Sequence, residues 1–574
     1  MANSKHFEIL LQGLDVWNAW RRKNPKVRPN LRGVSITEVD LSFIDFHDTD
    51  LRDCVLKNMG LNYANFQNAK LDNSDISLTA LTNANLSHAS LKHTKLVRSN
   101  LIDANCERAD FSGANLKGAG LWRVNFHGSR LVDANLSESG MNDAYCPDAN
   151  FDGANLKKTD LQQANLQKAS LRNAKLDLAD LYEANFEKAD LTGASLQRAN
   201  LKDAEFAEAI LTRASFNAAN LDGTLLTQCD LSTCTFKNAS MVNIKLIGSN
   251  LTGVDLSGRT LAGASFWQAN LTNANLSDTD CQMVEFAEAQ LVGANLSASY
   301  FPTAEFREAN LTDADLHGSN LANTSFLRAT VEGANFRNCY VYGMSAWDLI
   351  GTPKSQKDLV VTPPTEPIIT VDDLEVAQFV YLVYNNKKIR NFMNAFTEKN
   401  VLILGRFTPP ERKAVLDGLR EKLRTFDLVP IVFDFDAPED KDYTETVQTL
   451  AGMSMFVIVD VTNPKSTPLE MEATVKQFKI PYVPIIDTSA DQRPFAMMID
   501  LQKSFHWVLP TFAYKSKEEL FKNLKVIVID RALEKHNQLR DQKAKEGISM
   551  LTLEDLLKSS KKKTPRKKKV TLKA

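Results

Sequence analysis

Apolar residues recur every five positions along more than half of this chain. From Leu31 to Val341, every residue whose number ends in 1 or 6 is apolar, which makes 63 consecutive positions without an insertion or deletion. Two places before each of these centres the residue is nearly always small, and the residue just before it is often Asp or Asn. A helix repeats near 3.6 residues and a strand repeats every two, so a period of five fits neither.

A chain that turns a corner every five residues accounts for this period. One apolar residue on each side then points inward, and the residue two places before it lies near a corner where only a small group fits. Asp, Asn, Ser and Gly suit the tight turns between the sides. Four sides make one coil of about 20 residues, and coils stacked at the strand spacing of about 4.8 Å form a rod roughly 75 Å long.

The coil length also predicts which side chains share a wall. Fifteen of the centres are Phe, and nine of them fall on one face if positions 20 residues apart are stacked. We predict a ladder of stacked rings there, unless that side of the coil merely leaves more room. The nine are Phe46, Phe66, Phe126, Phe186, Phe206, Phe266, Phe286, Phe306 and Phe326.

Arg259 is the exception to the pattern, because it takes a position otherwise reserved for small groups. A buried, unpaired charge is costly. We expect the corner to open locally around Arg259; a solvent-directed side chain and a binding site are the alternatives.

The segments ANLQKASLRNAKL and ADLYEANFEKADL resemble the pentapeptide-repeat family, whose pattern is A(D/N)LXX. The resemblance implies a right-handed quadrilateral β-helix over residues 31–348. The first 30 residues contain one amphipathic stretch, Lys5 to Arg22, which predicts a single helix capping the open end of the rod. Its apolar face is predicted to contain Phe7, Leu10, Leu11, Leu14 and Trp17.

A different pattern follows the repeat. Residues 349–370 are rich in Pro, Thr and Lys and predict a linker, and residues 371–398 predict a connecting helix. Over residues 399–540, short apolar runs such as VLILGRF and SMFVIVDV alternate with helical segments, which is typical of a doubly wound α/β domain with a parallel sheet. Residues 541–574 predict a disordered basic tail.

Ligands of such sheets bind beyond the carboxyl ends of the strands. There we predict a ligand-binding set of Gly405, Arg406, Asp434 and Thr462. Glu470 lies on the helix after a strand, where a carboxylate could stabilise an oxocarbenium-like ribosyl centre during glycosidic cleavage. The run TPLE, from Thr467 to Glu470, also fits a capping box, which is the structural alternative for this glutamate.

The segments VIVDVTNPKSTPLEMEATV and VLILGRFTPPERKAVLDGLREKL resemble Toll/interleukin-1-receptor-like domains and the nucleoside-deoxyribosyltransferase-like group, which are flavodoxin-like folds. Enzymes of both groups cleave N-glycosidic bonds with a glutamate on the helix after this kind of strand. The resemblance therefore implies Glu470 as a catalytic residue, with Asp460 and Ser466 near it, and NAD as a substrate. Enzymatic receptor-like members usually show Ser-x-Trp-Cys before the glutamate, whereas this chain has Ser-Thr-Pro-Leu.

Charge and cysteine content add further limits. The chain has a net charge of -2, but residues 31–345 contain 26 Lys+Arg against 37 Asp+Glu, a difference of -11. Lys561 to Lys569 lie in a strongly basic tail, which predicts weak contact with nucleic acid or an anionic membrane, or else a simple solvated tail.

The seven cysteines occupy repeat positions without metal-ligand spacing, so we expect reduced core residues in a cytoplasm and no metal site. No apolar run is long enough to span a membrane.

These features predict a cytoplasmic, bacterial interaction scaffold. Its rod would bind or assemble a protein partner, with a homo-oligomer as a further option, and it would carry a nucleotide-binding-like signalling or effector domain. The first alternative is an NAD(P) glycohydrolase-type effector enzyme, with NAD as substrate and no other cofactor. The second alternative is a DNA mimic that binds gyrase, as some pentapeptide-repeat proteins do, although a charge of -11 over roughly 75 Å is sparser than that of duplex DNA.

Overall fold

The computed structural model describes residues 2–386, 399–405, 410–434, 444–462, 467–489 and 496–546. The chain divides into two compact units. The first consists of Met1–Val360 and Asp372–Gln378, and the second of Val361–Val371 and Phe379–Ala574.

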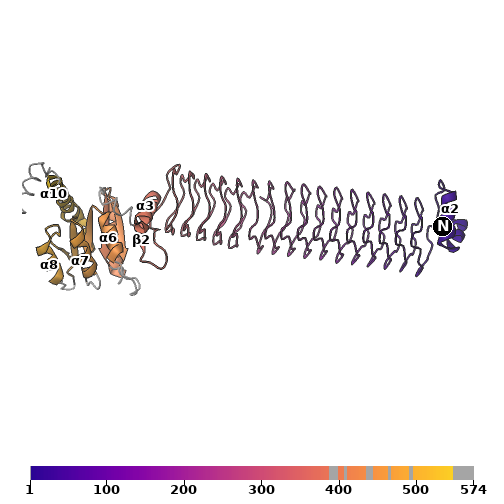
Figure 1. Cartoon of the computed structure of the whole chain (residues 1–574), viewed down its shortest axis with the longest axis horizontal. Helices are drawn as coiled ribbons and strands as arrows, with labels where there is room; N and C mark the ends of the chain where they lie inside the picture. The colour runs from indigo at the N-terminus through magenta and orange to yellow at the C-terminus, as the bar shows by residue number, and fades with distance from the viewer. Residues whose placement is uncertain are drawn as a thin grey trace, which may run out of the picture. The chain divides into compact units, whose positions relative to one another are not determined.

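The first unit is a stack of four-sided coils (Figure 1). Parallel bridges join residues 20 apart along it, from Asn30 and Asp50 to Tyr340 and Val360. The Leu181 N–H donates to the carbonyl oxygen of Asn200 at 2.7 Å, so the side that begins at Leu181 lies directly against the side one coil later. The predicted 20-residue coil is therefore confirmed.

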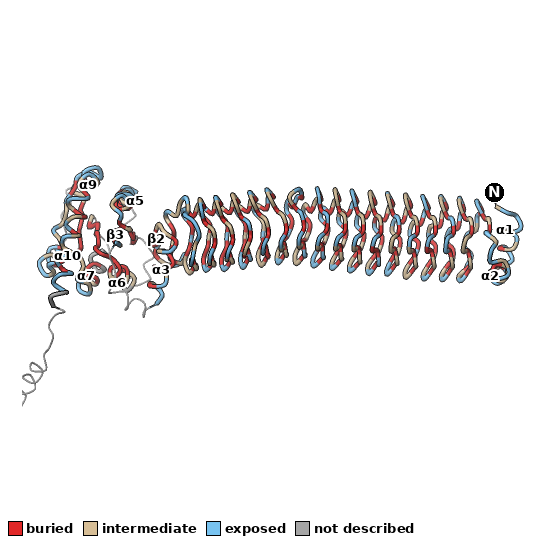
Figure 2. Tube along the Cα trace, turned by 90° about the horizontal axis from the view of Figure 1, so that it is seen from above, coloured by how far each residue is buried: buried red, intermediate tan, exposed pale blue. Residues whose placement is uncertain are grey.

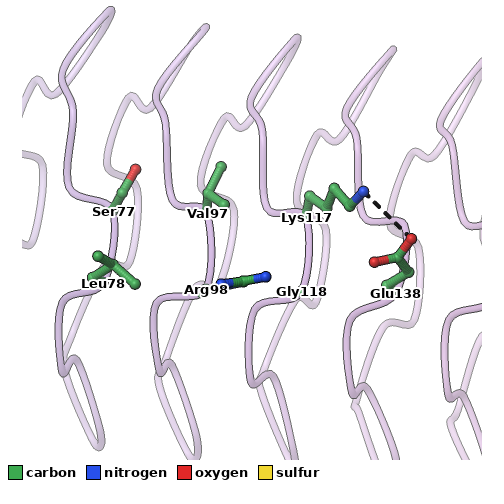
Figure 3. A pocket seen from close by; sticks show the side chains of 7 residues that line it. All are labelled: Ser77, Leu78, Val97, Arg98, Lys117, Gly118 and Glu138. Atoms are coloured by element: carbon green, nitrogen blue, oxygen red, sulfur yellow. Dashed lines mark ion pairs between the residues drawn. The ribbon is translucent and has the colours of Figure 1, made fainter.

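The apolar centres fill the inside of the coils (Figure 2). Every centre from Leu41 to Val341 is buried, whereas Ile36 in the first coil is only half-buried. The residue two places after a centre takes a left-handed backbone conformation at the corner, as do Leu78 with φ 62° and Arg98 with φ 56° (Figure 3). Such φ values are unfavourable for most side chains, and Asn, Asp and Gly tolerate them best, which explains why these residues are frequent at the corners.

Amide side chains form ladders along the outside of the coils. The Asn135 Oδ1 accepts the N–H of Ser137 at 3.2 Å, and its Nδ2 donates to the Asn115 Oδ1 at 3.2 Å. Asn155 repeats the contact one coil later by donating to the Asn135 Oδ1 at 3.1 Å. The Asn before a centre thus satisfies the turn of its own coil and links neighbouring coils.

The nine Phe rings of the predicted wall are all buried. The Phe186 and Phe206 rings stack with centroids 4.6 Å apart and planes at 8°. A longer run continues from Phe266 through Phe286 and Phe306 to Phe326, with centroid distances of 5.0, 4.9 and 4.8 Å. Because these distances match the spacing of the coils, the rings of these two runs pack face to face on the ring of the next coil. The predicted ladder is interrupted elsewhere, since Phe46 and Phe66 are tilted by 38° and Phe126 lies between Cys106 and Cys146 on the wall.

The cap at the first end of the stack is two helices, so the prediction of a single helix is wrong. These are α1 (Ser4–Leu11) and α2 (Leu14–Lys23). They are separated at Gly13, whose φ of 102° suits glycine and interrupts the helical path. The break turns Leu11 out to solvent, with 65% of its surface exposed. Trp17 is fully buried and packs edge-to-face with Phe46, with ring centroids 5.6 Å apart.

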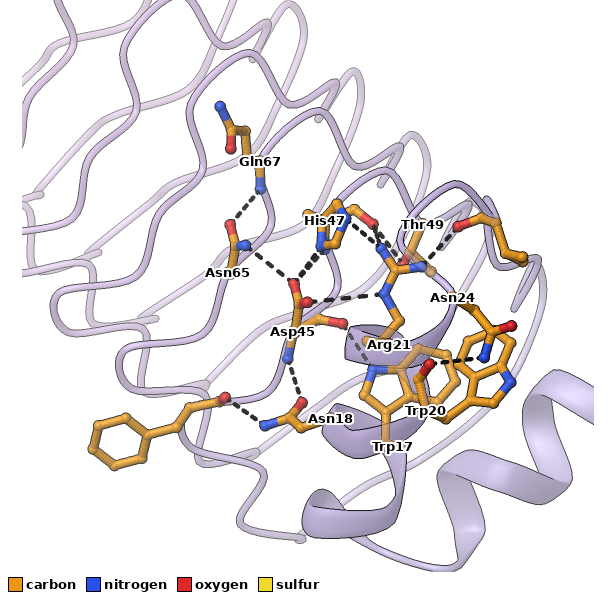
Figure 4. A network of polar contacts seen from close by, with 12 residues as sticks. Trp17, Asn18, Trp20, Arg21, Asn24, Asp45, His47, Thr49, Asn65 and Gln67 are labelled. Carbon is orange, nitrogen blue, oxygen red and sulfur yellow. Dashed lines mark hydrogen bonds and ion pairs between the residues drawn. The ribbon is translucent and has the colours of Figure 1, made fainter.

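Arg21 of α2 ties the cap to the first coils (Figure 4). It is buried, and its guanidinium donates to the carbonyl oxygens of Val27 at 2.8 Å and His47 at 2.7 Å. The His47 Nδ1 lies 2.6 Å from the Asp45 Oδ1, and the Trp17 Nε1 donates to the Asp45 carbonyl at 2.8 Å. These bonds satisfy most of the polar groups that the docked cap buries, although the Arg21 Nε is left without a hydrogen bond, 3.9 Å from the Asp45 Oδ2.

The segment predicted as a linker is part of the fold, so that prediction is wrong. Bridges from Thr330 to Ile350 and from Asn335 to Ser355 continue the stack to the strand β1 (Leu359–Val360). Another strand, β2 (Ile369–Val371), follows within the second unit. The helix α3 (Leu374–Asn385) occupies the first part of the predicted connecting helix, and residues 387–398 lie outside the described residues.

The second unit is an α/β domain with a mostly parallel sheet. After β2, its strands are β3 (Asn400–Gly405), β4 (Val429–Asp434), β5 (Phe456–Asp460), β6 (Tyr482–Asp487) and β7 (Phe512–Tyr514). They lie in the order β2-β4-β3-β5-β6-β7, and only β2 is antiparallel to its neighbour. The sequence pattern did not reveal β2, β7 or the helix α8 (Ala496–Ser504). The helices are α5 (Pro410–Arg424), α6 (Thr444–Gly452), α7 (Thr467–Gln477), α8 (Ala496–Ser504), α9 (Lys517–Leu524) and α10 (Asp530–Glu546), with a π-helical turn, η1 (Lys525–Ile529), before α10.

Candidate functional site

The carboxyl ends of the parallel strands bring three of the predicted site residues, Gly405, Asp434 and Asp460, to one edge of the sheet. Gly405 at the end of β3 pairs in register with Asp434 at the end of β4. On the other side of β3, Asp460 ends β5 and pairs with Ile485 of β6. Because the chain runs from β3 to β4 on one side and then crosses to β5 on the other, the strand order reverses here. Ligands of open α/β sheets bind at such a switch point.

Arg412 lies at the centre of this edge. It belongs to the first turn of α5, and its guanidinium donates to the Asp460 Oδ2 at 2.5 Å and to the Asp487 Oδ2 at 3.0 Å. It also donates to the Tyr514 hydroxyl at 2.6 Å. One side chain therefore connects the ends of β5, β6 and β7.

The electrostatics of this cluster keep its arginine charged. Burial lowers the pKa of the Arg412 guanidinium, but the charge of Asp460 and the contact with Tyr514 outweigh it and raise the pKa above its ordinary value. Burial, followed by the charge of Asp460, raises the pKa of Tyr514 to about 12, so its hydroxyl stays protonated at neutral pH.

Asp460 is fully engaged within the protein. Its Oδ2 accepts from Arg412, its Oδ1 accepts the N–H of Thr462 at 3.0 Å, and only 4% of its surface is exposed. The Thr462 Oγ1 in turn accepts the N–H of Asp487 at 2.9 Å. The polar atoms of Asp460 and Thr462 thus hold the strand ends in place.

Gly405 has a packing role in this arrangement. A Cβ atom added to it would lie 2.8 Å from the Leu416 Cδ2 and 3.3 Å from the Asp460 Cβ. Contacts this short require the neighbours to move. The glycine therefore lets α5 pack closely against the end of β3.

Comparison with known families identifies the first unit. A family model described as "Pentapeptide repeat region" matches residues 189–266 and 260–336. A second model, "Pentapeptide repeats (8 copies)", matches residues 40–77, 79–118, 121–157 and 144–182. The repeat domain of this chain belongs to the pentapeptide-repeat family. Its four-sided coils therefore form a right-handed quadrilateral β-helix.

Several solved structures are similar to the pentapeptide-repeat domain. HetL, a pentapeptide repeat protein involved in heterocyst differentiation regulation from the cyanobacterium Nostoc sp. strain PCC 7120, is 27% identical, with 45% of this chain and 96% of HetL covered and a TM-score of 0.21. QnrB1, a plasmid-mediated fluoroquinolone resistance protein, is 15% identical, with 36% and 92% covered and a TM-score of 0.24. A pentapeptide repeat protein of the Arabidopsis thaliana thylakoid lumen is 30% identical, with 16% and 68% covered and a TM-score of 0.15. No curated protein sequence matches the chain.

The pentapeptide-repeat domain offers little reactive chemistry in its interior. All seven cysteines are buried and unpaired, and burial raises the pKa of Cys54, for example, to about 11. The described part of the chain contains no group of three or more His, Cys, Asp or Glu side chains that could hold a metal ion. None of the helices among the described residues is long and apolar enough to cross a membrane.

Two of the remaining predicted site residues, Glu470 and Asp434, lie in described elements. The backbone of Glu470 lies in the first turn of α7, and Asp434 is the last residue of β4. Arg406, Ser466 and the basic tail from Lys561 to Lys569 lie outside the described residues.

Arg412, Asp487 and Tyr514 complete the site and were not predicted from the sequence. Asp487 follows the apolar run PYVPII, just as Asp460 follows FVIV, so strand-end position was a usable signal for it. Arg412 comes from a helix and Tyr514 from a three-residue strand, and no local pattern marks either as part of this edge.

Proposed function

We propose that this chain is a cytoplasmic interaction scaffold. The pentapeptide-repeat domain binds or assembles a protein partner, and the second unit serves as a receptor-like signalling module. The observation that carries this proposal is the engagement of Asp460, which lies at the switch point yet gives both carboxylate oxygens to Arg412 and to the N–H of Thr462. A buried carboxylate bonded in this way holds the strand ends in place, which favours a structural role for Asp460 over a role as a catalytic base.

The strand order supports a flavodoxin-like assignment of the second unit. In chain order its parallel strands are β3, β4, β5, β6 and β7, and in space they lie as β4-β3-β5-β6-β7. This is the 2-1-3-4-5 order of flavodoxin-like sheets, which many non-catalytic signalling domains share with enzymes.

The surface of the pentapeptide-repeat domain supports a binding role. Stacked coils present an extended surface, and each coil adds outward-facing side chains at its corners and sides. Large aromatic side chains stand on this surface, with 40% of Trp122, 48% of Tyr145 and 46% of Tyr300 exposed. Exposed Trp and Tyr are enriched at protein–protein interfaces.

Site-specific photo-cross-linking in the source cells tests the scaffold role. A photoreactive amino acid would replace, one at a time, an exposed residue at each of the four corners, namely Trp122, Trp267, Arg213 or Leu178. We expect one corner to yield a discrete cross-linked product, because a partner docked on a rod covers one face. Cross-linking at none of the four corners would contradict a partner on the rod.

A second candidate is an enzyme that cleaves the N-glycosidic bond of NAD. It is favoured by the position of Glu470, which lies in the first turn of α7 directly after the switch-point strand β5. The test is release of nicotinamide from NAD by the full chain and by Glu470→Gln, at high protein concentration. Glu472→Gln is the matched control, because Glu472 pairs with Lys476 at 2.5 Å on the same helix. Release that Glu470→Gln alone abolishes would establish the enzyme, and no release would favour the scaffold.

A further inference from the structure

One corner of the pentapeptide-repeat domain is basic, although residues 31–345 as a whole carry an excess of acidic residues. We call this corner the basic edge: it consists of residues 55–58 and of the equivalent four residues in each of the next five coils, up to 155–158. Its charged members are six basic and two acidic side chains. They are Lys57, Asp75, Lys95, Arg98, Lys117, Glu138, Lys157 and Lys158.

Both acidic side chains of the basic edge are already paired. Asp75 lies 2.9 Å from the Lys57 Nζ, and Glu138 lies 3.4 Å from the Lys117 Nζ. Among the described residues, no carboxylate forms an ion pair with the remaining four basic side chains. These are Lys95, Arg98, Lys157 and Lys158, all exposed.

A groove with an apolar part lies on the same edge, next to Arg98 (Figure 3). It has a volume of ≈ 410 Å³ and crosses four successive coils. Leu78 lines it with 55% of its surface exposed, and Val97 lies beside Arg98 on the next coil. The paired side chains of Lys117 and Glu138 lie at its other end.

From this combination we infer that the basic edge binds an acidic peptide segment of a protein partner, with an apolar side chain of that segment seated against Leu78 and Val97. This inference rests on the proposed scaffold function and specifies its partner. The edge spans six coils, or about 24 Å, which matches about seven residues of extended peptide. Carboxylates of such a peptide would meet the unpaired charges of Lys95 and Arg98.

A peptide fits this edge better than a nucleic acid does. Binding of single-stranded nucleic acid uses aromatic side chains on which bases stack. The groove is lined instead by the aliphatic side chains of Leu78 and Val97, and no aromatic residue occurs among the four-residue corners of the basic edge.

The test measures binding of a fluorescein-labelled heptapeptide, with six acidic residues around a central leucine, to the full chain by fluorescence anisotropy. We expect affinity that falls with added salt, and about a tenfold loss in Arg98→Glu. Arg198→Glu is the matched control, because Arg198 occupies the same corner five coils later with φ 57° and is also exposed. Beside Arg198, Asp177 occupies the position that Ser77 has in the groove, and its negative charge disfavours an acidic peptide there. We therefore expect Arg198→Glu to change the peptide affinity by less than about twofold.

A second variant separates a seated side chain from simple charge attraction. Leu78→Asn removes the apolar group but keeps a residue that tolerates the left-handed corner. It should weaken the leucine-centred peptide about fivefold and leave a glycine-centred version unchanged. The inference would be overturned if Arg98→Glu and Arg198→Glu lost the same affinity for the peptide, or if the peptide did not bind at low salt. It would also be overturned if duplex DNA bound as tightly as the peptide and Leu78→Asn left the DNA affinity unchanged. These outcomes leave the proposed function open to its own tests, since the cross-linking and the nicotinamide assays do not depend on Arg98 or Leu78.

Discussion

The Nε of Arg259 donates a hydrogen bond of 3.1 Å to the carbonyl oxygen of Phe236, 23 residues earlier in the chain. Small polar side chains at the same coil position reach the equivalent acceptor elsewhere, as the Ser99 Oγ does with the Ile76 carbonyl at 2.6 Å. Arg259 therefore makes the usual bond with an unusually large group, and the stack opens around it, as the sequence predicted. Beside Arg259, no bridge joins Thr235 to Asp255 or Ser240 to Thr260 among the described coils, whereas Lys245 to Ser265 and Asn250 to Asn270 on the other two sides are bridged.

Arg259→Ser should close this opening. A serine can make the same bond to Phe236 without holding the coils apart, so the missing bonds between coils can form. We expect the free energy of local opening at Thr260 to rise by about 1–2 kcal/mol, measured by native-state hydrogen exchange. Arg98→Ser, which changes an exposed corner arginine, should leave exchange at Thr260 unchanged; unchanged exchange in Arg259→Ser would contradict the explanation.

Truncating a ring of the Phe wall should destabilise the coils on either side of it. Phe286 stacks between Phe266 and Phe306, so Phe286→Ala leaves a cavity and should cost about 3–5 kcal/mol. Phe286→Leu should cost much less, because Leu226 and Leu246 occupy the same wall. Since each coil contacts only its neighbours, hydrogen exchange of the adjacent coils is the measurement to use. Equal costs for the two variants would contradict this explanation, because the aromatic ring and not the filled volume would then be the source of the stability.

Removal of Arg412 should weaken the second unit. Arg412→Met leaves Asp460 buried without its cation, and we expect a loss of about 3–5 kcal/mol in thermal or denaturant unfolding of that unit. The double variant Arg412→Met/Asp460→Asn should recover part of the loss, because the unpaired charge is then gone. Lys476→Met, which removes an exposed ion pair with Glu472, should cost under about 1 kcal/mol. A loss in Arg412→Met no larger than this control would mean that the Arg412 cluster does not support the fold.

The N-terminal cap should loosen in acid. Burial, and then the charge of Arg21, lowers the pKa of His6 from its usual value of 6.5. A lowered pKa means that the docked cap favours the neutral ring, so the contribution of His6 is complete above pH 6.5 and is lost as the pH falls through the lowered value. Hydrogen-exchange protection factors of α1 should therefore decrease between pH 7 and pH 5. His6→Gln, which still offers an acceptor to the Asn30 N–H, should show no such decrease.

Some predictions succeeded and others failed for identifiable reasons. The opening at Arg259 was predictable because the repeat places a small residue at that position, and a large charged side chain there must separate the neighbouring coils. The single capping helix was wrong because the amphipathic pattern continues through Gly13, where the backbone leaves the helix. The linker was wrong because Pro and Thr suggest irregular chain, whereas the bridges from Thr330 to Ile350 and from Asn335 to Ser355 depend on the coil already stacked beneath.

The square coil and its stacked walls could be predicted from the chain alone, because each inward side chain meets residues of its own coil and of the neighbouring coils, as Phe206 meets Phe216 and Phe186. A local rule repeated 63 times favours one arrangement, in which every centre but Ile36 is buried. The edge of the second unit is different. Arg412 meets Asp460, Asp487 and Tyr514 across 48, 75 and 102 residues of chain, and no short-range pattern encodes those contacts. Only the crossing of the chain at the switch point brings these side chains together. The pairing of Asp460 with Arg412 is therefore decided by the tertiary structure and not by the local sequence.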